Sequence, residues 1–456
     1  MTLVALGFVG IVGAIVLMFM PRRFMPALAL AVLVVLPVGY MDVPRLIGRY
    51  FSPAVIILAV WMIRTVLSTR DAPAAPVRVG TLLWIPVLGA VAVTVALGLA
   101  PGLSVVWVLV VLVCVVLPYL YGRTRHDEVW VSSQSAYLWI GVFVGGLAVL
   151  DFIAGFNPWS SLFSYDVTDK VWSVFRTRTS LGHPLVTSTV ATVCAMIALF
   201  GSDTRRWLRI AALAGSGAAV ILAVSRTGVL AVAIGLALGC LVLLFGASPS
   251  KRTRRVTAFF LMVSAVGFLG VVTNSPLLEQ RNDSTGGVKS SDYREQSTAV
   301  AADLISDNWL IGLGPGNSAA QFSSVFDGPL ENSVLQLLLS LGIPLAALAL
   351  SAVVVIVLRV SKRGDAGVAA AIVAFCVSLT GFSAIDVNPA LLVFLTPLMY
   401  RAGQVIGSIG SFSASAETSR QNVVVPTGQR AVSPYQRRTP IRAQDRTARR
   451  PTGRRR

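Results

Sequence analysis

The chain has 456 residues, of which 55% are hydrophobic and only 13% are charged, and its formal net charge is +18. Many uncharged stretches of about 17 to 22 residues are long enough to cross a hydrocarbon core of about 30 Å as helices. This composition excludes a soluble globular protein, and spans so long and so evenly apolar exclude a barrel of short alternating strands. The sequence therefore predicts an all-α, polytopic transmembrane helical bundle.

The apolar pattern predicts about 12 to 13 spans. The first apolar stretch lacks a basic leading region and is long enough to span, so no cleavable signal peptide is expected. The expected spans are Thr2–Met20, Phe24–Tyr40, Tyr50–Leu67, Gly80–Leu99, Leu103–Tyr121, Ala136–Gly155, Pro184–Phe200, Leu208–Val224, Thr227–Phe245, Val256–Thr273, Asn332–Leu358, Ala366–Ile385 and Pro389–Tyr400.

Basic residues gather in the short loops that share one side when these spans alternate. They are Arg22 and Arg23, Arg70 and Arg78, Arg123 and Arg125, Arg205, Arg206 and Arg209, the run Lys251–Arg255, and Lys362 and Arg363. The positive-inside pattern makes this side cytoplasmic, together with the carboxy-terminal tail. The long loop 274–330, with three basic and seven acidic residues, is then extracytoplasmic. We expect a multi-pass protein of the cell (cytoplasmic) membrane.

The composition changes near residue 405, which predicts a transmembrane domain over 1–405 and a separate tail over 406–456. From Arg420 to Arg456 the tail has eleven Arg and one acidic residue, Asp445. Such a segment cannot bury enough apolar surface to fold, so we expect a disordered tail held near anionic membrane lipids. A docking arm for an acidic partner is the alternative. No folded module accompanies the charge, so no nucleic acid is expected as a partner.

Neither a metal site nor a cofactor is indicated. The four cysteines each lie singly inside an expected span, with no CxxC pair and no nearby His: Cys114, Cys194, Cys240 and Cys376. They imply no metal centre and no disulfide framework. The chain also has no phosphate-binding loop and no dinucleotide fingerprint, which argues against an ATP-driven pump.

Two short outward segments carry arginines. In the first, Arg176 and Arg178 precede His183 and Pro184. Proline suits the first turn of a helix, so His183 is either a functional residue or only part of a helix start. In the second, Arg226 lies between two apolar spans with hardly any loop to expose it. An arginine at that depth needs a partner, unless its side chain reaches the outer interface.

The third outward segment is the long loop, which closes with the strings GLGPGN and ENSVLQLLLSLG. Its glycines, Gly314 and Gly316 among them, either let the backbone approach a ligand or simply form the tight turn that ends a helix. Glu331 and Asn332 stand where the next span begins.

Together these segments resemble the O-antigen ligase and O-antigen polymerase family of bacterial membrane glycosyltransferases. The resemblance rests on SRTG at Ser225–Gly228, on Arg294 followed by DNWLIGLGPGN, and on the series that Asn332 opens. The motifs occur in family order across about Arg176 to Leu350. One departure stands out, because the family typically has His at the position of Glu331.

The resemblance implies an enzyme that transfers a glycan from a polyprenyl (undecaprenyl) pyrophosphate carrier to a hydroxyl of a glycan or lipid-linked acceptor. The reaction would take place at the outer face, in exopolysaccharide, capsule or surface-glycan assembly, as polymerase or ligase. It would need no metal and no cofactor, since arginine guanidinium groups can hold the pyrophosphate leaving group. Other glycan-assembly membrane proteins are possible partners.

The expected site follows from this chemistry. Arg226 and Arg294 are the catalytic arginines, and Glu331, ionised at neutral pH, is the candidate base in place of His. The substrate-binding candidates are Arg176, Arg178, His183, Gly314, Gly316 and Asn332. Two alternatives stay open: Glu331 caps the helix that starts at Asn332, or loop acids such as Glu279, Asp283 and Asp292 neutralise Arg294.

Two other classes of function remain. A lipid-linked oligosaccharide flippase or another transporter predicts ionisable residues deep in several spans and internal repeats, and neither is evident in the sequence. A non-catalytic membrane scaffold would recruit its partner through the Arg-rich tail.

Overall fold

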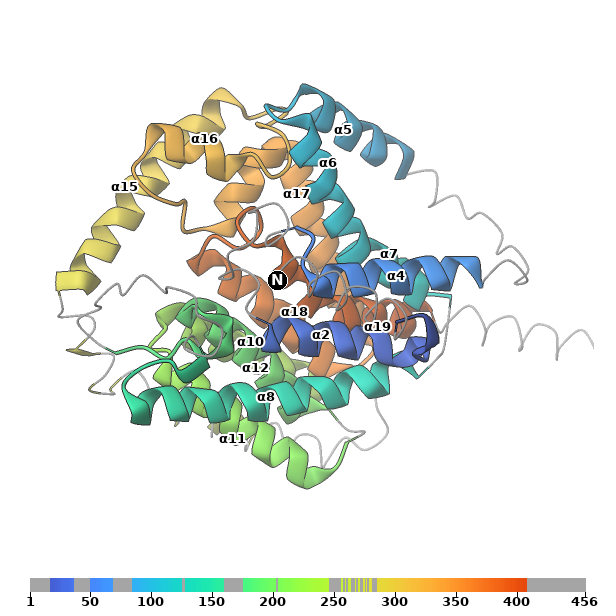
Figure 1. Ribbon diagram of the computed structural model, residues 1–456, viewed down its shortest axis with the longest axis vertical. Coiled ribbons are helices and arrows are strands. Elements are labelled where there is room, and N and C mark those ends of the chain that lie inside the picture. Colours follow the sequence, from blue (N-terminus) through green and yellow to red (C-terminus); the bar gives the residue numbers. More distant parts are fainter. Residues whose placement is uncertain are drawn as a thin grey trace, which may run out of the picture. The chain divides into compact units, whose positions relative to one another are not determined.

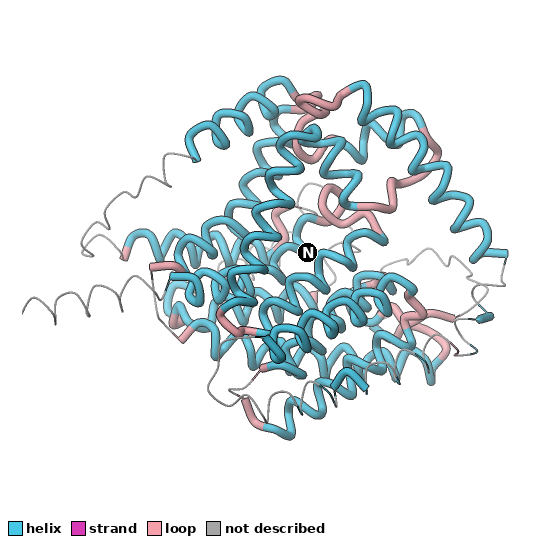
Figure 2. The backbone as a smooth tube through the Cα atoms, turned by 180° about the vertical axis from the view of Figure 1, so that it is seen from behind, coloured by secondary structure: helices cyan, strands magenta, loops and turns pink. Residues whose placement is uncertain are grey.

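The computed structural model describes residues 17–36, 50–68, 84–124, 128–159, 175–201, 204–245 and 285–407, together with scattered residues between 256 and 280. Met1–Ser408 forms one compact unit. Most of the expected spans Thr2–Met20 and Val256–Thr273, and all but two residues of the tail, lie outside the described residues. Within the described part of the chain, only helices, turns and loops occur (Figure 2).

The prediction of an all-α membrane bundle is confirmed. Among the described residues, five helical stretches are long and apolar enough to cross a membrane: Pro101–Gly122, Val129–Ala154, Arg226–Phe245, Ser333–Lys362 and Pro389–Gly407. Three shorter apolar helices accompany them: Pro53–Leu67, Pro184–Phe200 and Ala366–Gly381. The chain is thus a multi-pass membrane protein.

The amino-terminal helices run from η1 to α8, and of these η1 and α2 pack against the long helix α8. The bounds are η1 Arg22–Phe24, α2 Met25–Val35, α4 Pro53–Leu67, α5 Trp84–Leu97, α6 Pro101–Val111, the short π-helix η4 Leu112–Val116, α7 Leu117–Gly122 and α8 Val129–Ala154. Pro53 and Pro101 begin their helices, where the missing N–H is not needed.

The helix α10 Pro184–Phe200 packs against four others: α8, α11 Arg206–Leu222, α12 Arg226–Phe245 and α18 Ala366–Ser378 (Figure 1). Small residues allow close crossings: a Cβ on Gly145 of α8 would lie 2.2 Å from Gly215 Cα of α11. Almost all of α10 is buried, and the hydroxyl groups of Ser188, Thr189 and Thr192 donate to backbone carbonyls of the same helix, as Thr192 does to Ser188 at 2.7 Å.

Over its described residues from 285 to 330, the long loop is largely helical. It forms α15 Thr285–Asp307 and α16 Ser318–Val325, which both contact α17 Ser333–Lys362 (Figure 1). The sequence predicts one span over Asn332–Leu358, but α17 breaks at Gly342, whose φ is 75° and ψ 164°. Pro344 follows the break, so no N–H is available there to continue the helix.

Loop backbone replaces the hydrogen bonds that the break in α17 removes. Leu313 N donates to Leu339 O at 2.9 Å, and Ile343 N donates to Trp309 O at 2.7 Å. Non-helical backbone in a membrane protein is tolerated where protein groups satisfy it in this way. The long loop is therefore tied to the first half of α17.

The expected span Ala366–Ile385 also ends early. α18 continues as the 3-10 turn η6 Leu379–Gly381 and gives way to a coil over 382–388, before η7 Pro389–Leu395 and α19 Thr396–Gly407. Ser333 fixes this coil, since its Oγ donates to Phe382 O at 2.7 Å and accepts from Ala384 N at 2.9 Å. The result is that the Gly381 carbonyl lies beside the start of α17.

Candidate active site

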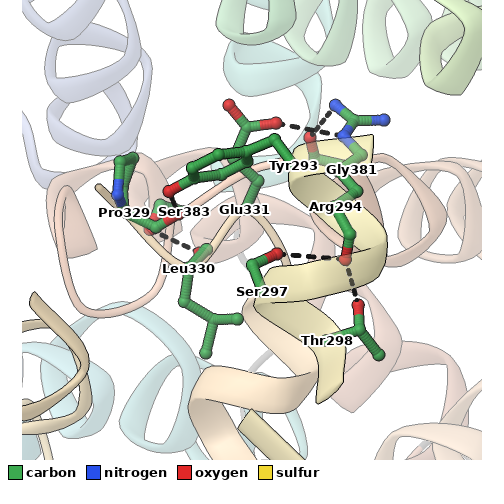
Figure 3. A network of polar contacts seen from close by, with 9 residues as sticks. All are labelled: Tyr293, Arg294, Ser297, Thr298, Pro329, Leu330, Glu331, Gly381 and Ser383. Atoms are coloured by element: carbon green, nitrogen blue, oxygen red, sulfur yellow. Dashed lines mark hydrogen bonds and ion pairs between the residues drawn. The ribbon is translucent and has the colours of Figure 1, made fainter. Parts of the chain in front are cut away.

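Arg294 and Glu331 form an ion pair at the centre of the site (Figure 3). Arg294 Nε lies 3.0 Å from Glu331 Oε2, and Arg294 Nη2 donates to the Gly381 carbonyl at 3.1 Å. Both side chains are 32% exposed, so the pair is partly buried but open to a ligand. Three separate segments, α15, the start of α17 and the end of η6, thus meet at one guanidinium group.

The segment just before α17 is held by the side chains of Ser383 and Gln336. Ser383 Oγ donates to Leu330 O at 2.9 Å, and Gln336 Nε2 donates to Leu330 O at 3.3 Å and to Ser383 Oγ. Because these bonds fix the residue before Glu331, they fix the direction in which the carboxylate leaves the backbone.

The structure bears on the two alternatives that the sequence left open for this pair. Asn332, not Glu331, caps α17, because its Oδ1 accepts from Val334 N at 2.9 Å and from Leu335 N at 3.3 Å. Arg294 pairs with Glu331 rather than with Glu279 or Asp292, whose side chains are both exposed. Asp283, the third expected acid, lies outside the described residues.

Arg226 begins α12 in the SRTG turn. Ser225 Oγ accepts from Gly228 N at 3.0 Å, as an N-cap does. The Arg226 side chain is exposed, and the described part of the chain gives it no ion pair. Its neighbour Thr227 packs on Gly381, since a Cβ at Gly381 would lie 2.3 Å from Thr227 Oγ1. The SRTG turn therefore touches the glycine that accepts from Arg294.

The first arginine segment lies beside the SRTG turn. Thr177 N donates to Leu222 O at 3.1 Å, and the buried Arg176 donates from Nε to Ala223 O at 3.0 Å. Arg178 is partly buried. These bonds join the segment that carries Arg176 and Arg178, just before α10, to the turn between α11 and α12 that carries Arg226.

His183 has the geometry of a helix start. It is the N-cap of α10, and its Nδ1 accepts from Leu185 N at 3.2 Å, with Pro184 in the first helical position. The ring nitrogen used for the cap is not available to a substrate in this arrangement.

Gly314 and Gly316 lie in a buried turn, with φ of 92° and 80°. A Cβ on Gly314 would lie 2.6 Å from Gly98 Cα, and one on Gly316 would lie 3.2 Å from the Trp107 ring. These contacts are those of a tight packing turn, and they do not bring either glycine to Arg294.

Sequence reasoning missed Tyr293, Gly381 and Ser383. Tyr293 OH donates to Pro329 O at 2.8 Å, and burial, together with the charges of Glu331 and Asp327, raises the pKa of Tyr293 to about 12. Tyr293 therefore stays protonated at neutral pH and acts as a donor. For Gly381 and Ser383 a signal did exist, because the run Thr-Gly-Phe-Ser interrupts the apolar pattern of the expected span Ala366–Ile385.

Within the described residues, no three His, Cys, Asp or Glu side chains are grouped so that they could hold a metal ion. No curated protein matches the chain. The sequence model of the O-antigen ligase family matches residues 210–350, from α11 to the second half of α17. This range contains Arg226, Arg294 and Glu331, the three residues expected to be catalytic. Over this part of the chain the resemblance to the O-antigen ligase family is thereby confirmed.

Proposed function

We propose that this protein transfers a glycan from a polyprenyl pyrophosphate carrier to a hydroxyl of a glycan or lipid-linked acceptor, at the outer face of the cytoplasmic membrane. The O-antigen ligase match supports transfer of the ligase or polymerase type in surface-glycan assembly. The observation that carries the proposal is the meeting of SRTG, Arg294 and Glu331 around Gly381.

The arginines suit a pyrophosphate leaving group. Arg294 donates from Nε to Glu331 and from Nη2 to the Gly381 carbonyl, and its Nη1 has no partner within the described residues. Arg226 is exposed on the neighbouring turn. Guanidinium forks that are partly desolvated bind phosphate oxygens strongly and stabilise the negative charge that develops as the glycosidic bond breaks.

Glu331 is the proposed base. Arg294 holds its Oε2, while Oε1 has no hydrogen-bond partner in the described part of the chain. As the acceptor oxygen bonds to the anomeric carbon, the bond from that carbon to the phosphate oxygen breaks, and the polyprenyl pyrophosphate leaves with the electron pair. The acceptor hydroxyl gives its proton to Glu331 Oε1. Arg294 thus orients the base and faces the leaving group.

A reconstituted assay tests the proposal. The purified protein in lipid nanodiscs is given a polyprenyl pyrophosphate oligosaccharide and a glycan acceptor, and we measure elongated glycan together with released polyprenyl pyrophosphate. We expect both products in equal amounts, and we expect them also in the presence of EDTA, because arginines supply the positive charge. Intact donor after prolonged incubation with the wild-type protein would contradict the proposal.

Deletion in cells separates transfer from transport. Loss of the transferase leaves single lipid-linked repeat units on the outer face of the membrane, whereas loss of a flippase leaves them on the inner face. A topology reporter active only outside the cytoplasm should be active after Gly287 and inactive after Lys251. The opposite pair of reporter results would place the long loop in the cytoplasm and would contradict a site at the outer face.

A further inference from the structure

A buried aspartate lies behind the first arginine segment. Asp151, in the last turn of α8, is only 1% exposed. Its Oδ2 accepts hydrogen bonds from two consecutive backbone amides, Arg178 N at 3.1 Å and Thr179 N at 2.7 Å. A buried carboxylate in an apolar helix is costly, and one that accepts two amide hydrogen bonds has an evident structural purpose.

The two amides belong to a strained piece of backbone. Thr179 has φ of 52° and Val224 has φ of 47°, and these are the non-glycine residues with positive φ among those described. Each is β-branched, a side chain for which this conformation is unfavourable. Thr179 follows Arg178, and Val224 lies two residues before Arg226. The strain therefore coincides with both arginine segments.

The carbonyls of the same residues are held as well. Thr187 Oγ1 donates to Arg178 O at 2.8 Å, and Asn157 Nδ2 donates to Thr179 O at 2.8 Å. The segment is in turn bonded to the chain before SRTG, through Thr177 N and Leu222 O. Loss of the Asp151 hydrogen bonds would therefore shift the backbone of both arginine segments.

We propose that Asp151 is a positioning residue, which fixes the backbone at Arg178 and, through the joined segments, the placement of Arg178 and Arg226 towards the Arg294–Glu331 pair. Its effect on catalysis rests on the proposed function, whereas its effect on the backbone does not. Asp151 does not touch the reacting groups, and it acts only through the arginines that do.

Hydrogen–deuterium exchange of the full chain in nanodiscs tests the anchoring alone. Asp151→Ala removes the acceptor, so the Arg178 and Thr179 amides should exchange at least about 10-fold faster. Asp151→Asn keeps an acceptor oxygen and should stay near the wild-type rate. Asp365→Ala is the matched control, because Asp365 also accepts a backbone amide, Val368 N at 3.3 Å, at the opposite end of α18 from Gly381. Unchanged exchange in Asp151→Ala would overturn the anchoring.

The transfer assay tests the catalytic consequence. Asp151→Ala should lower kcat/KM about 10- to 100-fold, the scale expected when a binding group is displaced by about 1 Å. Asp151→Asn should recover most of the rate, and Asp151→Ala combined with Arg178→Ala should lose less than the product of the two single losses, because part of the effect of Asp151 passes through Arg178. Independent, multiplying losses would overturn the positioning role. A wild-type protein with the expected exchange pattern but no transfer overturns the proposed function, while the anchoring stands.

Discussion

Two parts of the long loop, one around Arg294 and one around Gly314, were both expected to contact the substrate, but their surroundings in the structure differ. Around Arg294 the contacts are made by side chains, with an ion pair to Glu331 that is 32% exposed on both partners. In the turn that holds Gly314 the contacts are made by backbone, and the residues are buried. The first part offers charge to a ligand, and the second offers close packing.

A glycine-rich motif can thus hold two segments of the same protein together rather than contact a ligand. A Cβ at Gly312 would lie 2.4 Å from Gly342 N, at the break in α17, and a Cβ at Gly314 would meet Gly98 at the end of α5. Both glycines are needed because backbone meets backbone at positive φ. Substitutions should therefore affect rate in one part and stability in the other.

The largest effect is expected at Arg294. Arg294→Ala removes the charge, and Arg294→Lys replaces the planar guanidinium fork with a compact ammonium, so each should lower the transfer rate on the order of 10²- to 10³-fold. The initial rate in nanodiscs measures this. Arg401→Lys is the matched control, since Arg401 pairs with Asp365 at 3.1 Å with 33% exposure, and it should keep most activity. Near-normal activity in Arg294→Lys would reduce the pair to a structural salt bridge.

Glu331 comes next. Glu331→Gln keeps the shape of the side chain but cannot take up a proton, so the rate should fall on the order of 10²-fold at normal protein level. Glu331→His should retain partial activity, because His is the residue that the family typically has at this position. If Glu331→Gln transfers glycan at the wild-type rate, the base is another group, with Asp292 and His183 the next to be tested.

The buried turn should respond in stability rather than in rate. Gly314→Ala places a Cβ against Gly98 at a φ of 92°, and we expect a loss of about 1 to 3 kcal/mol in the free energy of unfolding. Denaturation in detergent measures it. Gly102→Ala in α6, where a Cβ meets nothing within 4 Å, is the control and should be close to neutral. A large fall in rate without a stability change would show that the turn binds substrate.

The smallest effect is expected from the tail. Truncation after Arg420 removes most of the positive charge of the carboxy terminus but none of the groups around Gly381, so transfer per molecule should stay within about twofold of the wild type. Membrane abundance is measured in parallel. Complete loss of product at normal abundance would favour the scaffold function instead.

Much of the fold was predictable because hydropathy is a local signal. The expected span Pro184–Phe200 has the bounds of α10, and Thr227–Phe245 differs from α12 by one residue. The break at Gly342 was not predicted, because it depends on pairing with Trp309 and Leu313, which lie some thirty residues earlier in the chain.

The site was predictable in its residue types but not in its pairings. Partners for Arg294 were sought among acids of the same loop, whereas the structure selects Glu331, 37 residues further along the chain. The run Thr-Gly-Phe-Ser marks the place of Gly381 in the sequence, but its role depends on its carbonyl and on packing by Thr227, and side-chain chemistry reveals neither. Asp151 was missed for the same reason, since its partners are backbone amides.

The broken helix has a consequence for how this domain can be exchanged or redesigned. Residues 309–313 supply the hydrogen bonds that the backbone of α17 lacks at 339 and 343, so loop and half-helix form one cassette. A chimera that transplants the outer loop alone would leave the acceptor of Leu339 and the donor of Ile343 without their native partners inside an apolar bundle. The natural unit of recombination runs from residue 309 to residue 343, and it carries Glu331 within it.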